Sequence, residues 1–295
     1  MNTELNNSTP AHIHIQNIKN KKYSAFDLTQ NTLKNLHDQD KQLNAYINIL
    51  DDYALARAKH LDDEIAAGHN LPLAGVPIAV KDMLALKNYP TTAGSKTLEN
   101  FTPAYNSTVV NKLEAAGAII VGKTSCDEFA MGSSNEYAFT GPVHNPWDID
   151  RVPGGSSGGS AATVAARGVA WSIGTDTGGS IRQPASFNGI YGMKPTYGRV
   201  SRFGVVAFAS SLEQVGPMAH NVYDLSLLLH IIAGHDSNDS TTLDVDVPKY
   251  HESLDRDIKG LKIAIPENIY EGISDDVHQK IQSAIDVFRK NGAEV

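Results

Sequence analysis

The segment GGSSGGSAATVAARGVAWSIGTDTGGS, residues 154–180, contains two glycine–serine turns that are separated by two ordered-looking runs. The small residues 161–166 favour a tightly buried helix, and residues 171–174 are typical of the end of a strand. Glycine lets backbone N–H groups approach a ligand closely, and a serine hydroxyl in such a turn can act as a nucleophile or a proton relay. The segment therefore predicts α/β structure that carries a nucleophilic catalytic site.

Each turn also has a simpler interpretation. The first turn could be a flexible linker and the second a plain turn before a helix. Linkers are rarely joined directly to a compact apolar helix, however, and a loop that enters a helix directs several free N–H groups at one point. Ser180, at the end of the second turn, would have its own N–H and its neighbours' directed at the atom that its oxygen attacks. An oxyanion hole requires this geometry.

A serine nucleophile needs a base, and the sequence offers Lys81. None of the 11 histidines lies within either glycine motif, and His12 and His14 are expected to face solvent in a polar leader. Lys81 follows the apolar run GVPIAV, so desolvation can lower its pKa towards neutrality. Asp82 would oppose that shift, but adjacent residues of a strand point to opposite faces.

Two further motifs are considered and rejected. GAIIVGKT, residues 117–124, matches the GxxxxGK[ST] pattern of a phosphate-binding loop. Its variable residues are themselves strand-like and follow a predicted helix, whereas a phosphate loop follows its strand. Cys126 could be a thiol nucleophile, but a small buried residue is the better interpretation.

The N-terminal part of the chain has a helical pattern. Ser24 can cap a helix with recurring apolar positions, and Asp27 lies three residues after this cap. The pattern continues over residues 51–67 and stops at Gly68. We therefore expect residues 1–70 to form a helical segment that packs on the core.

Residues 71–295 are predicted to form an α/β domain. Residues 73–80 and 118–121 are strand-like, and Pro77 indicates a bulge or an edge position within the first of them. Ser107 can cap a helix that precedes the second strand.

The C-terminal residues repeat this succession of elements. Residues 261–265 predict a strand and residues 277–288 a helix, and the sequence stops at Val295, just inside a further predicted strand. We interpret the sequence as a fragment of a longer protein, so that the α/β domain is incomplete at its C-terminus. The polar stretch 234–248 is the expected connector.

Composition narrows the class of protein. A net charge of −8 over 295 residues argues against a general polyanion-binding surface. No apolar stretch approaches ~20 residues, the start of the chain lacks a signal pattern, and one cysteine excludes an intrachain disulfide. No metal-ligand spacing is present. These features indicate a cytoplasmic protein without a membrane partner or a metal site.

These motifs resemble those of the amidase signature enzymes, from about residue 60 onwards and most specifically through residues 145–200. The resemblance implies a mixed β-sheet covered by helices on both faces. It also implies a Ser–cis-Ser–Lys triad in which Ser180 is the acyl nucleophile, Ser156 the bridging serine and Lys81 the base. The implied oxyanion donors are the backbone N–H groups of Thr177, Gly178, Gly179 and Ser180, and Gly132 is implied to lie in the substrate pocket.

Within the family, residues 127–136 and 194–204 resemble the glutamine-hydrolysing subunits of tRNA-dependent amidotransferases. This resemblance implies that glutamine is hydrolysed through a seryl ester. Ammonia would pass to a B subunit that uses ATP and Mg to convert misacylated Glu-tRNA(Gln), and a C subunit would complete a heterotrimer. This chain itself would need no cofactor. A free-standing amidase of small carboxamides and a nucleotide-binding module at residues 117–124 are the alternatives.

Overall fold

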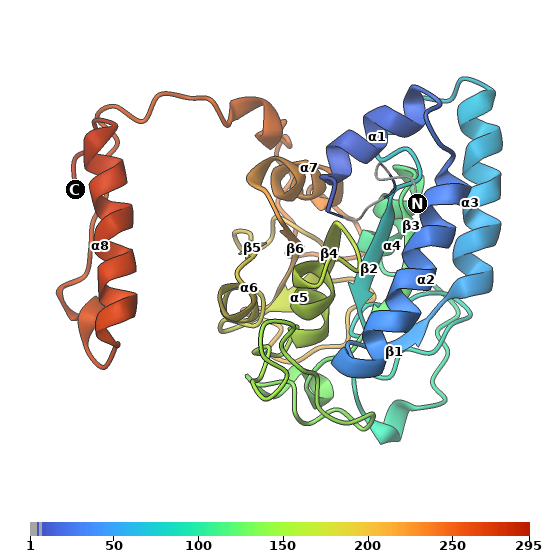
Figure 1. Cartoon of the computed structure of the whole chain (residues 1–295), viewed down its shortest axis with the longest axis horizontal. Helices are drawn as coiled ribbons and strands as arrows, with labels where there is room; N and C mark the ends of the chain where they lie inside the picture. The colour runs from blue at the N-terminus through green and yellow to red at the C-terminus, as the bar shows by residue number, and fades with distance from the viewer. Residues whose placement is uncertain (1–4, 6–7) are drawn as a thin grey trace. The chain divides into compact units, whose positions relative to one another are not determined.

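The computed structural model describes residue 5 and residues 8–295, and its elements are drawn in Figure 1. Within that part of the chain, six strands form one mixed sheet in the order β1-β3-β2-β4-β6-β5. Strands β3, β2 and β4 are parallel, and the other three each run antiparallel to a neighbour. The strands are β1 Tyr46–Ile49, β2 Pro77–Lys81, β3 Ile119–Thr124, β4 Trp171–Asp176, β5 Tyr191–Gly192 and β6 Gln214–Ala219. The predicted α/β class is confirmed.

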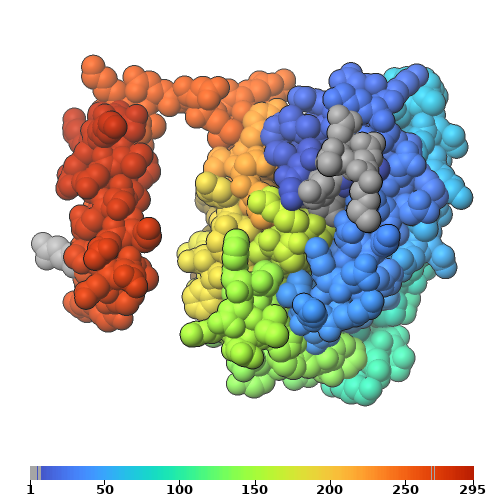
Figure 2. All heavy atoms as spheres, viewed as in Figure 1, coloured from blue at the N-terminus to red at the C-terminus, as the bar shows by residue number. Residues whose placement is uncertain are grey.

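Helices of the first unit cover both faces of this sheet. Helix α2 packs with α5 as one group, and α4 packs with α7 as another (Figure 1). Figure 2 shows the helical residues near the N-terminus, in blue, at the surface of this unit. The α-helices are α1 Ala11–Lys19, α2 Ala25–Leu43, α3 Asp51–Ala66, α4 Thr108–Ala115, α5 Gly158–Ala165, α6 Arg182–Asn188, α7 Val222–Ile232 and α8 Asp275–Lys290. Short 3₁₀ turns are η2 Lys96–Leu98, η3 Glu128–Ala130, η4 Tyr250–Ser253 and η5 Glu267–Tyr270.

The predicted start of α2 is confirmed by its hydrogen bonds. Ser24 Oγ accepts from the Asp27 N–H at 2.9 Å, and Asp27 Oδ2 accepts from the Ser24 N–H at 3.1 Å. This reciprocal pair is a capping box. Asp62 of α3 accepts hydrogen bonds from the next two amides, Ala25 and Phe26, at 2.7 and 3.0 Å. The N-terminus of α2 is therefore fixed to α3 by a carboxylate.

The expectation that His12 and His14 face solvent was wrong for His14, and His12 is only partly exposed. Both lie in α1, a helix within the predicted helical segment 1–70 whose own residues were interpreted as a polar leader. His14 is buried and its Nδ1 is hydrogen-bonded to the Tyr23 hydroxyl at 2.6 Å, and His12 Nδ1 pairs with Asp224 Oδ1 at 2.7 Å. Polar partners within the protein make these polar residues suitable for a packed helix.

Pro77 begins β2, and of the two alternatives that it suggested, a bulge or an edge position, the structure shows the first. The β2–β3 register shifts between Ile78 and Ala79, so the predicted irregularity is present. The strand is central rather than at an edge, because β3 and β4 flank it. Proline is tolerated as the first residue of a strand. Its carbonyl oxygen accepts a hydrogen bond from the fully buried Trp171 Nε1 at 3.0 Å.

The chain divides into two compact units, Met1–His251 and Glu252–Val295. The six-stranded sheet lies in the first unit. In the second unit, residues 261–265 do not form the predicted strand: Lys262 makes only an isolated parallel bridge with Glu294, before and after α8. A single bridge lacks the neighbouring strands that would extend it.

The polar stretch 234–248 is not the free connector that the sequence suggests. Asp236, Asp239 and Thr242 are buried within the first unit. The predicted boundary between residues 70 and 71 stays a prediction, and residues 1–4 and 6–7 of its helical part lie outside the described residues. In the described part of the chain, no helix combines the length and the apolar character needed to cross a bilayer.

Candidate active site

Lys81 ends β2 with its amine enclosed by the protein. The residue is 0% exposed, and Nζ donates hydrogen bonds of 2.8 Å each to Ser156 Oγ and Thr175 Oγ1. Burial lowers the pKa of Lys81, because water no longer stabilises its charged form. The charges that the side chains of Cys126, Glu213, Asp127 and Asp176 carry when they are ionised oppose this shift. The environment therefore favours the neutral amine that a general base requires.

Ser156 lies in a loop that is held from two sides. A cis peptide bond joins Gly155 to Ser156. The Gly155 N–H donates to Gln183 Oε1 at 2.9 Å, and a Cβ atom at Gly155 would lie 2.1 Å from Asp127 Oδ2. Only glycine allows this close approach. The following residue, Ser157, donates its hydroxyl to the Thr175 carbonyl oxygen at 3.0 Å, so the loop is bound to the end of β4.

Ser180 ends the second glycine–serine turn and is half-buried. Its carbonyl oxygen accepts a hydrogen bond from the Ser157 N–H at 3.1 Å, which brings the two serine loops together. Within the described part of the chain, no hydrogen bond joins the hydroxyls of Ser156 and Ser180, and the Ser180 residue lines a cavity. The first link of the predicted relay is formed, whereas the second needs the two hydroxyls to approach.

Asp176 organises the loop that carries Ser180. Its carboxylate accepts hydrogen bonds from the Gly179 and Ile181 N–H groups at 2.8 and 3.1 Å, and from Arg182 Nε and Nη2 at 3.0 Å each. Burial alone would raise the pKa of Asp176, but the hydrogen bonds from Arg182 and Ile181 outweigh it and lower the pKa. An ionised carboxylate therefore fixes the conformation of this loop.

The predicted oxyanion donors differ in their availability. The Gly179 N–H is engaged by Asp176. The N–H groups of Gly178 and Ser180 donate to no group that the structure describes, and Thr177 directly follows β4 in the same loop. The role of Thr177, Gly178 and Gly179 as oxyanion donors stays a prediction. Of the N–H groups in this loop, those of Gly178 and Ser180 are the unengaged ones that could serve an oxyanion.

A cavity of about 480 Å³ opens onto Ser180. Gly132, which the family resemblance implies to lie in the substrate pocket, is among the residues that line this cavity, and a Cβ atom at Gly132 would lie 2.3 Å from Asp127 Cγ. Asp127 therefore excludes side chains at both Gly132 and Gly155. The cavity is lined by Ala130, Met131, Gly132, Ser133, Gly155, Gly178, Gly179, Ser180, Gln183 and Phe208.

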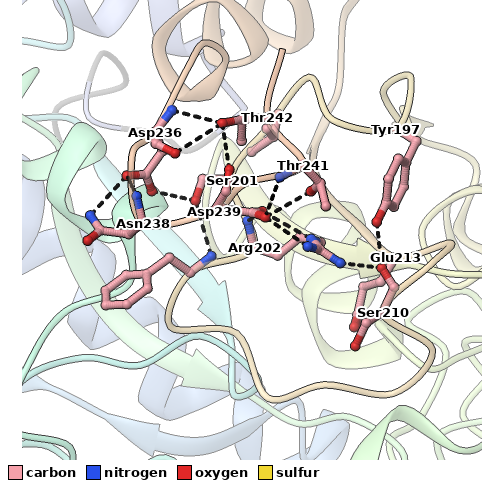
Figure 3. Close-up of polar contacts among 12 residues, drawn as sticks. Tyr197, Ser201, Arg202, Ser210, Glu213, Asp236, Asn238, Asp239, Thr241 and Thr242 are labelled. Atoms are coloured by element: carbon pink, nitrogen blue, oxygen red, sulfur yellow. Dashed lines mark hydrogen bonds and ion pairs between the residues drawn. The ribbon is translucent and has the colours of Figure 1, made fainter. Parts of the chain in front are cut away.

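The segment that carries Phe208 is held by a polar cluster, shown in Figure 3. The Phe208 N–H donates to Glu213 Oε2 at 3.2 Å. Arg202 binds the Asp239 carboxylate through Nε at 3.0 Å and Nη2 at 2.8 Å, and also donates to the Ser210 carbonyl oxygen (Figure 3). These contacts hold the segment that forms one wall of the cavity. The sequence pattern does not show that this segment lies near the site.

The two rejected motifs are not available to a ligand. In GAIIVGKT, Gly117 and Ala118 follow α4, and residues 119–124 form strand β3. Lys123 is 0% exposed and its Nζ lies 2.8 Å from Asp82 Oδ1. Burial raises the pKa of the Cys126 thiol to about 12, so it remains protonated at neutral pH. Among the described residues, no group of His, Cys, Asp and Glu side chains is arranged to hold a metal ion.

Sequence reasoning missed the roles of Thr175 and Asp176. Thr175 is the second hydrogen-bond partner of Lys81, and Asp176 fixes the loop of Ser180. The signal that could have revealed them is a buried strand that ends in Thr-Asp directly before a Gly-Gly-Ser turn. A carboxylate at that position can accept from the free N–H groups of the loop.

Several known proteins are similar to this chain in sequence. The family model described as Amidase matches residues 27–295. The chain is 52% identical to the A subunit of glutamyl-tRNA(Gln) amidotransferase from Prochlorococcus marinus (strain NATL2A), over 95% of this chain and 58% of that protein. It is 50% identical to the corresponding protein of Coxiella burnetii (strain Dugway 5J108-111), over 94% of this chain and 58% of that protein. The chain thus spans less than two thirds of the length of these relatives.

Solved structures are similar as well. The crystal structure of the A subunit of glutamyl-tRNA(Gln) amidotransferase from Thermotoga maritima matches 92% of this chain and 57% of its own, with a TM-score of 0.82 and 41% identity. The native peptide amidase from Stenotrophomonas maltophilia matches 100% of this chain and 61% of its own, with a TM-score of 0.89 and 34% identity.

Proposed function

This chain belongs to the amidase family, and we propose that it is the glutamine-hydrolysing part of a tRNA-dependent amidotransferase. The observation that carries the proposal is the buried contact of 2.8 Å between Lys81 Nζ and Ser156 Oγ, beside the cavity that Ser180 lines. The sequence identity of 50–52% to A subunits of glutamyl-tRNA(Gln) amidotransferases supports glutamine as the substrate.

In the proposed acylation, Ser180 Oγ attacks the side-chain amide carbonyl of glutamine. Its proton passes to Ser156, and Ser156 gives its own proton to the neutral amine of Lys81. The protonated lysine then returns a proton through Ser156 to the leaving ammonia, and water releases glutamate from the ester. Catalytic hydrogen bonds often tighten only when substrate binds, so the two hydroxyls are expected to approach in the complex.

The loop after β4 would stabilise the tetrahedral intermediate. Its oxyanion would accept from the unengaged N–H groups of Gly178 and Ser180, and one such donor contributes roughly 3 kcal/mol. Asp176 supports this role because its hydrogen bonds to Gly179 and Arg182 fix the loop before substrate arrives. No rearrangement of these donors is then needed during the reaction.

We further propose that the ammonia serves B and C subunits that complete a heterotrimer and convert Glu-tRNA(Gln) to Gln-tRNA(Gln). The B subunit would bind ATP and Mg and use them to activate Glu-tRNA(Gln). The GAIIVGKT residues do not suit a nucleotide phosphate, because Lys123 is buried against Asp82. We therefore assign acyl activation to a partner in this proposal.

A free-standing amidase acting on small carboxamides is the second candidate. The observation that favours it is the similarity to a peptide amidase over the whole of this chain, with a TM-score of 0.89. Both candidates use the same three side chains, so the triad does not separate them.

The test uses the complete reading frame that contains this chain, purified alone and with its partner subunits. We expect glutamine hydrolysis that rises when the partners, ATP and Glu-tRNA(Gln) are present, and that Ser180→Ala abolishes. Rapid hydrolysis of simple aliphatic amides, unchanged by the partners, would instead identify the free-standing amidase. Glutamine hydrolysis that survives in Ser180→Ala would contradict both.

A further inference from the structure

A second buried lysine, Lys123, lies close to the site and has no part in the proposed mechanism. It is 0% exposed, and its Nζ donates to Asp82 Oδ1 at 2.8 Å and to Thr91 Oγ1 at 3.1 Å. Asp82 is also 0% exposed and directly follows Lys81 in the chain. Moving both charges of an ion pair from water into the interior has a large desolvation free energy, so a fully buried pair beside a catalytic lysine calls for an explanation.

The register of the sheet places the pair and the catalytic amine on opposite faces. In the parallel β2–β3 ladder, Val80 lies opposite Lys123, and Lys81 lies opposite Thr124. Side chains alternate along a strand, so Lys123 shares a face with Val80 and Asp82, and Lys81 shares the other face with Thr124. The ion pair therefore holds the Asp82 carboxylate away from the face on which Lys81 contacts Ser156.

Asp82 connects the strand to the loop that follows it. Its Oδ2 accepts from Thr92 N–H at 2.8 Å and Thr92 Oγ1 at 2.5 Å, and its backbone N–H donates to Thr124 O at 3.0 Å. Its carbonyl oxygen accepts from Ala93 N–H at 3.1 Å, and Ala93 O accepts from Phe129 N–H at 2.8 Å. Phe129 immediately precedes the residues that line the cavity. The pair is thus joined to the substrate side of the site as well.

The charge of Lys123 also matters to Lys81. Without it, a buried carboxylate would remain one residue from the catalytic amine and would favour its protonated form, which cannot accept a proton. Other elements already supply carboxyl groups whose charge favours protonated Lys81: these are Glu213, Asp127 and Asp176, while the buried Cys126 thiol stays protonated. Lys123 pairs with Asp82 at 2.8 Å, so its positive charge offsets the charge of the carboxylate.

We propose that Lys123 is a positioning residue for the Ser180 nucleophile, acting through Asp82 and Lys81. It holds the Asp82 carboxylate on the opposite face of β2 and cancels its charge, so that the strand presents an uncharged Lys81 amine to Ser156. The lysine of the rejected phosphate-loop pattern thereby acquires a role in acyl transfer. The inference rests on the proposed relay but not on the identity of the amide substrate.

The test measures how fast a fluorophosphonate reagent labels Ser180 in the complete chain, as a function of pH. The Ser180 Oγ–phosphorus bond forms, the phosphorus–fluorine bond breaks, and the serine proton passes to the base as fluoride leaves. Neither glutamine nor a partner protein is needed. Labelling that persists in Ser180→Ala would refute the relay itself, and this outcome is distinct from a failure of the Lys123 proposal.

The acid limb of the labelling profile is the range in which the rate falls as the pH is lowered and Lys81 becomes protonated. For Lys123→Met we expect this limb to move up by about one pH unit, so that the rate at a given pH on the limb is roughly tenfold lower. The double variant Asp82→Asn/Lys123→Met removes both charges and should return the limb to its original position. Lys112→Met is the matched control: this half-buried lysine donates to the Ala233 carbonyl oxygen, and its loss should leave the profile unchanged. A folded Lys123→Met with the original limb, or a double variant with the shifted limb, would overturn the proposal.

Asp82→Asn provides the opposite displacement if Lys123→Met does not fold. It leaves an unpaired ammonium group near Lys81, which disfavours a second positive charge, so the acid limb should move to lower pH. A purely structural ion pair would lower the labelling rate of both single variants without moving the limb in opposite directions. An unchanged or raised limb in folded Asp82→Asn would therefore count against the proposal.

Discussion

The Asp176 carboxylate binds the Arg182 guanidinium through two hydrogen bonds of 3.0 Å, and Ser180 lies in the loop between the two residues. The same carboxylate accepts from the Gly179 and Ile181 N–H groups inside this loop. One side chain therefore determines where the nucleophile and its neighbouring amides point. The consequences can be measured.

Asp176→Asn should slow acylation of Ser180 by about 10- to 100-fold, because charge-assisted hydrogen bonds contribute about 1.5–3 kcal/mol each. Arg182→Lys should cost less but still slow acylation, since lysine cannot bind both carboxylate oxygens in the same plane. Burst kinetics of ester formation measure the effect. Acylation at the original rate in Asp176→Asn would show that the loop keeps its conformation without this carboxylate.

Asp176→Asn should also change the dependence of stability on pH. The folded-state pKa of Asp176 is lowered, so its ionised form contributes stability above the unfolded pKa, and this stability is lost as the pH falls through the folded pKa. Urea unfolding between about pH 2 and 6 should therefore show a shallower acid loss in the variant. Equal slopes in both proteins would exclude this contribution.

Lys81→Met and Ser156→Ala should each reduce kcat/KM by several orders of magnitude, and the double variant by little more, because they act in one relay. Removal of a general base alone costs about 10²- to 10⁴-fold. Single-turnover rates of all three variants give the coupling. Losses that multiply fully would show that the two residues act independently.

Activity should fall on the acid side of the lowered Lys81 pKa, because protonation below that pKa removes the base. The profile of kcat/KM against pH reports this limb for the free enzyme. A profile that stays flat until the ordinary carboxylate range would mean that Lys81 does not carry the essential proton.

Gly155→Ala and Gly132→Ala should both abolish activity or folding, since their Cβ atoms would lie 2.1 and 2.3 Å from atoms of Asp127. Gly178→Ala is the matched control for folding in the same cavity, because nothing lies within 4 Å of its Cβ position. Thermal melts and ester formation measured together separate folding from catalysis. Comparable activity in all three variants would contradict the described packing.

Cys126 should resist thiol reagents in the native protein and react after denaturation, because it is fully buried with a pKa of about 12. Reaction with an aromatic disulfide at pH 8, followed with and without urea, measures this difference. Rapid modification of the folded protein would show that this part of the core opens readily.

The sequence predicted the helices and strands with strong periodicity, and it predicted the contact between Lys81 and Ser156. It interpreted His12 and His14 as part of a polar leader, because their polar partners, Asp224 and Tyr23, are brought near only in the folded chain. It overpredicted a strand at 261–265, because an apolar run does not reveal whether neighbouring strands are present.

The residues of the candidate site also divide into those that the sequence identified and those that it did not. Residues inside glycine-rich motifs were identified, since glycine and serine spacing is visible along the chain. Phe208 and Glu213 were not, because their relation to the cavity depends on hydrogen bonds in the loop after residue 202. The pairing of Lys123 with Asp82 also depends on the register between β2 and β3, which periodicity alone does not determine.

The crowding of Gly132 and Gly155 by one carboxylate limits how this enzyme can evolve. A side chain at either glycine would collide with Asp127, so these two positions of the cavity lining do not tolerate substitution. Met131 and Phe208 line the same cavity yet are 57% and 46% exposed. New substrate preferences should therefore arise through these two side chains, and directed evolution for other amides should select changes there first.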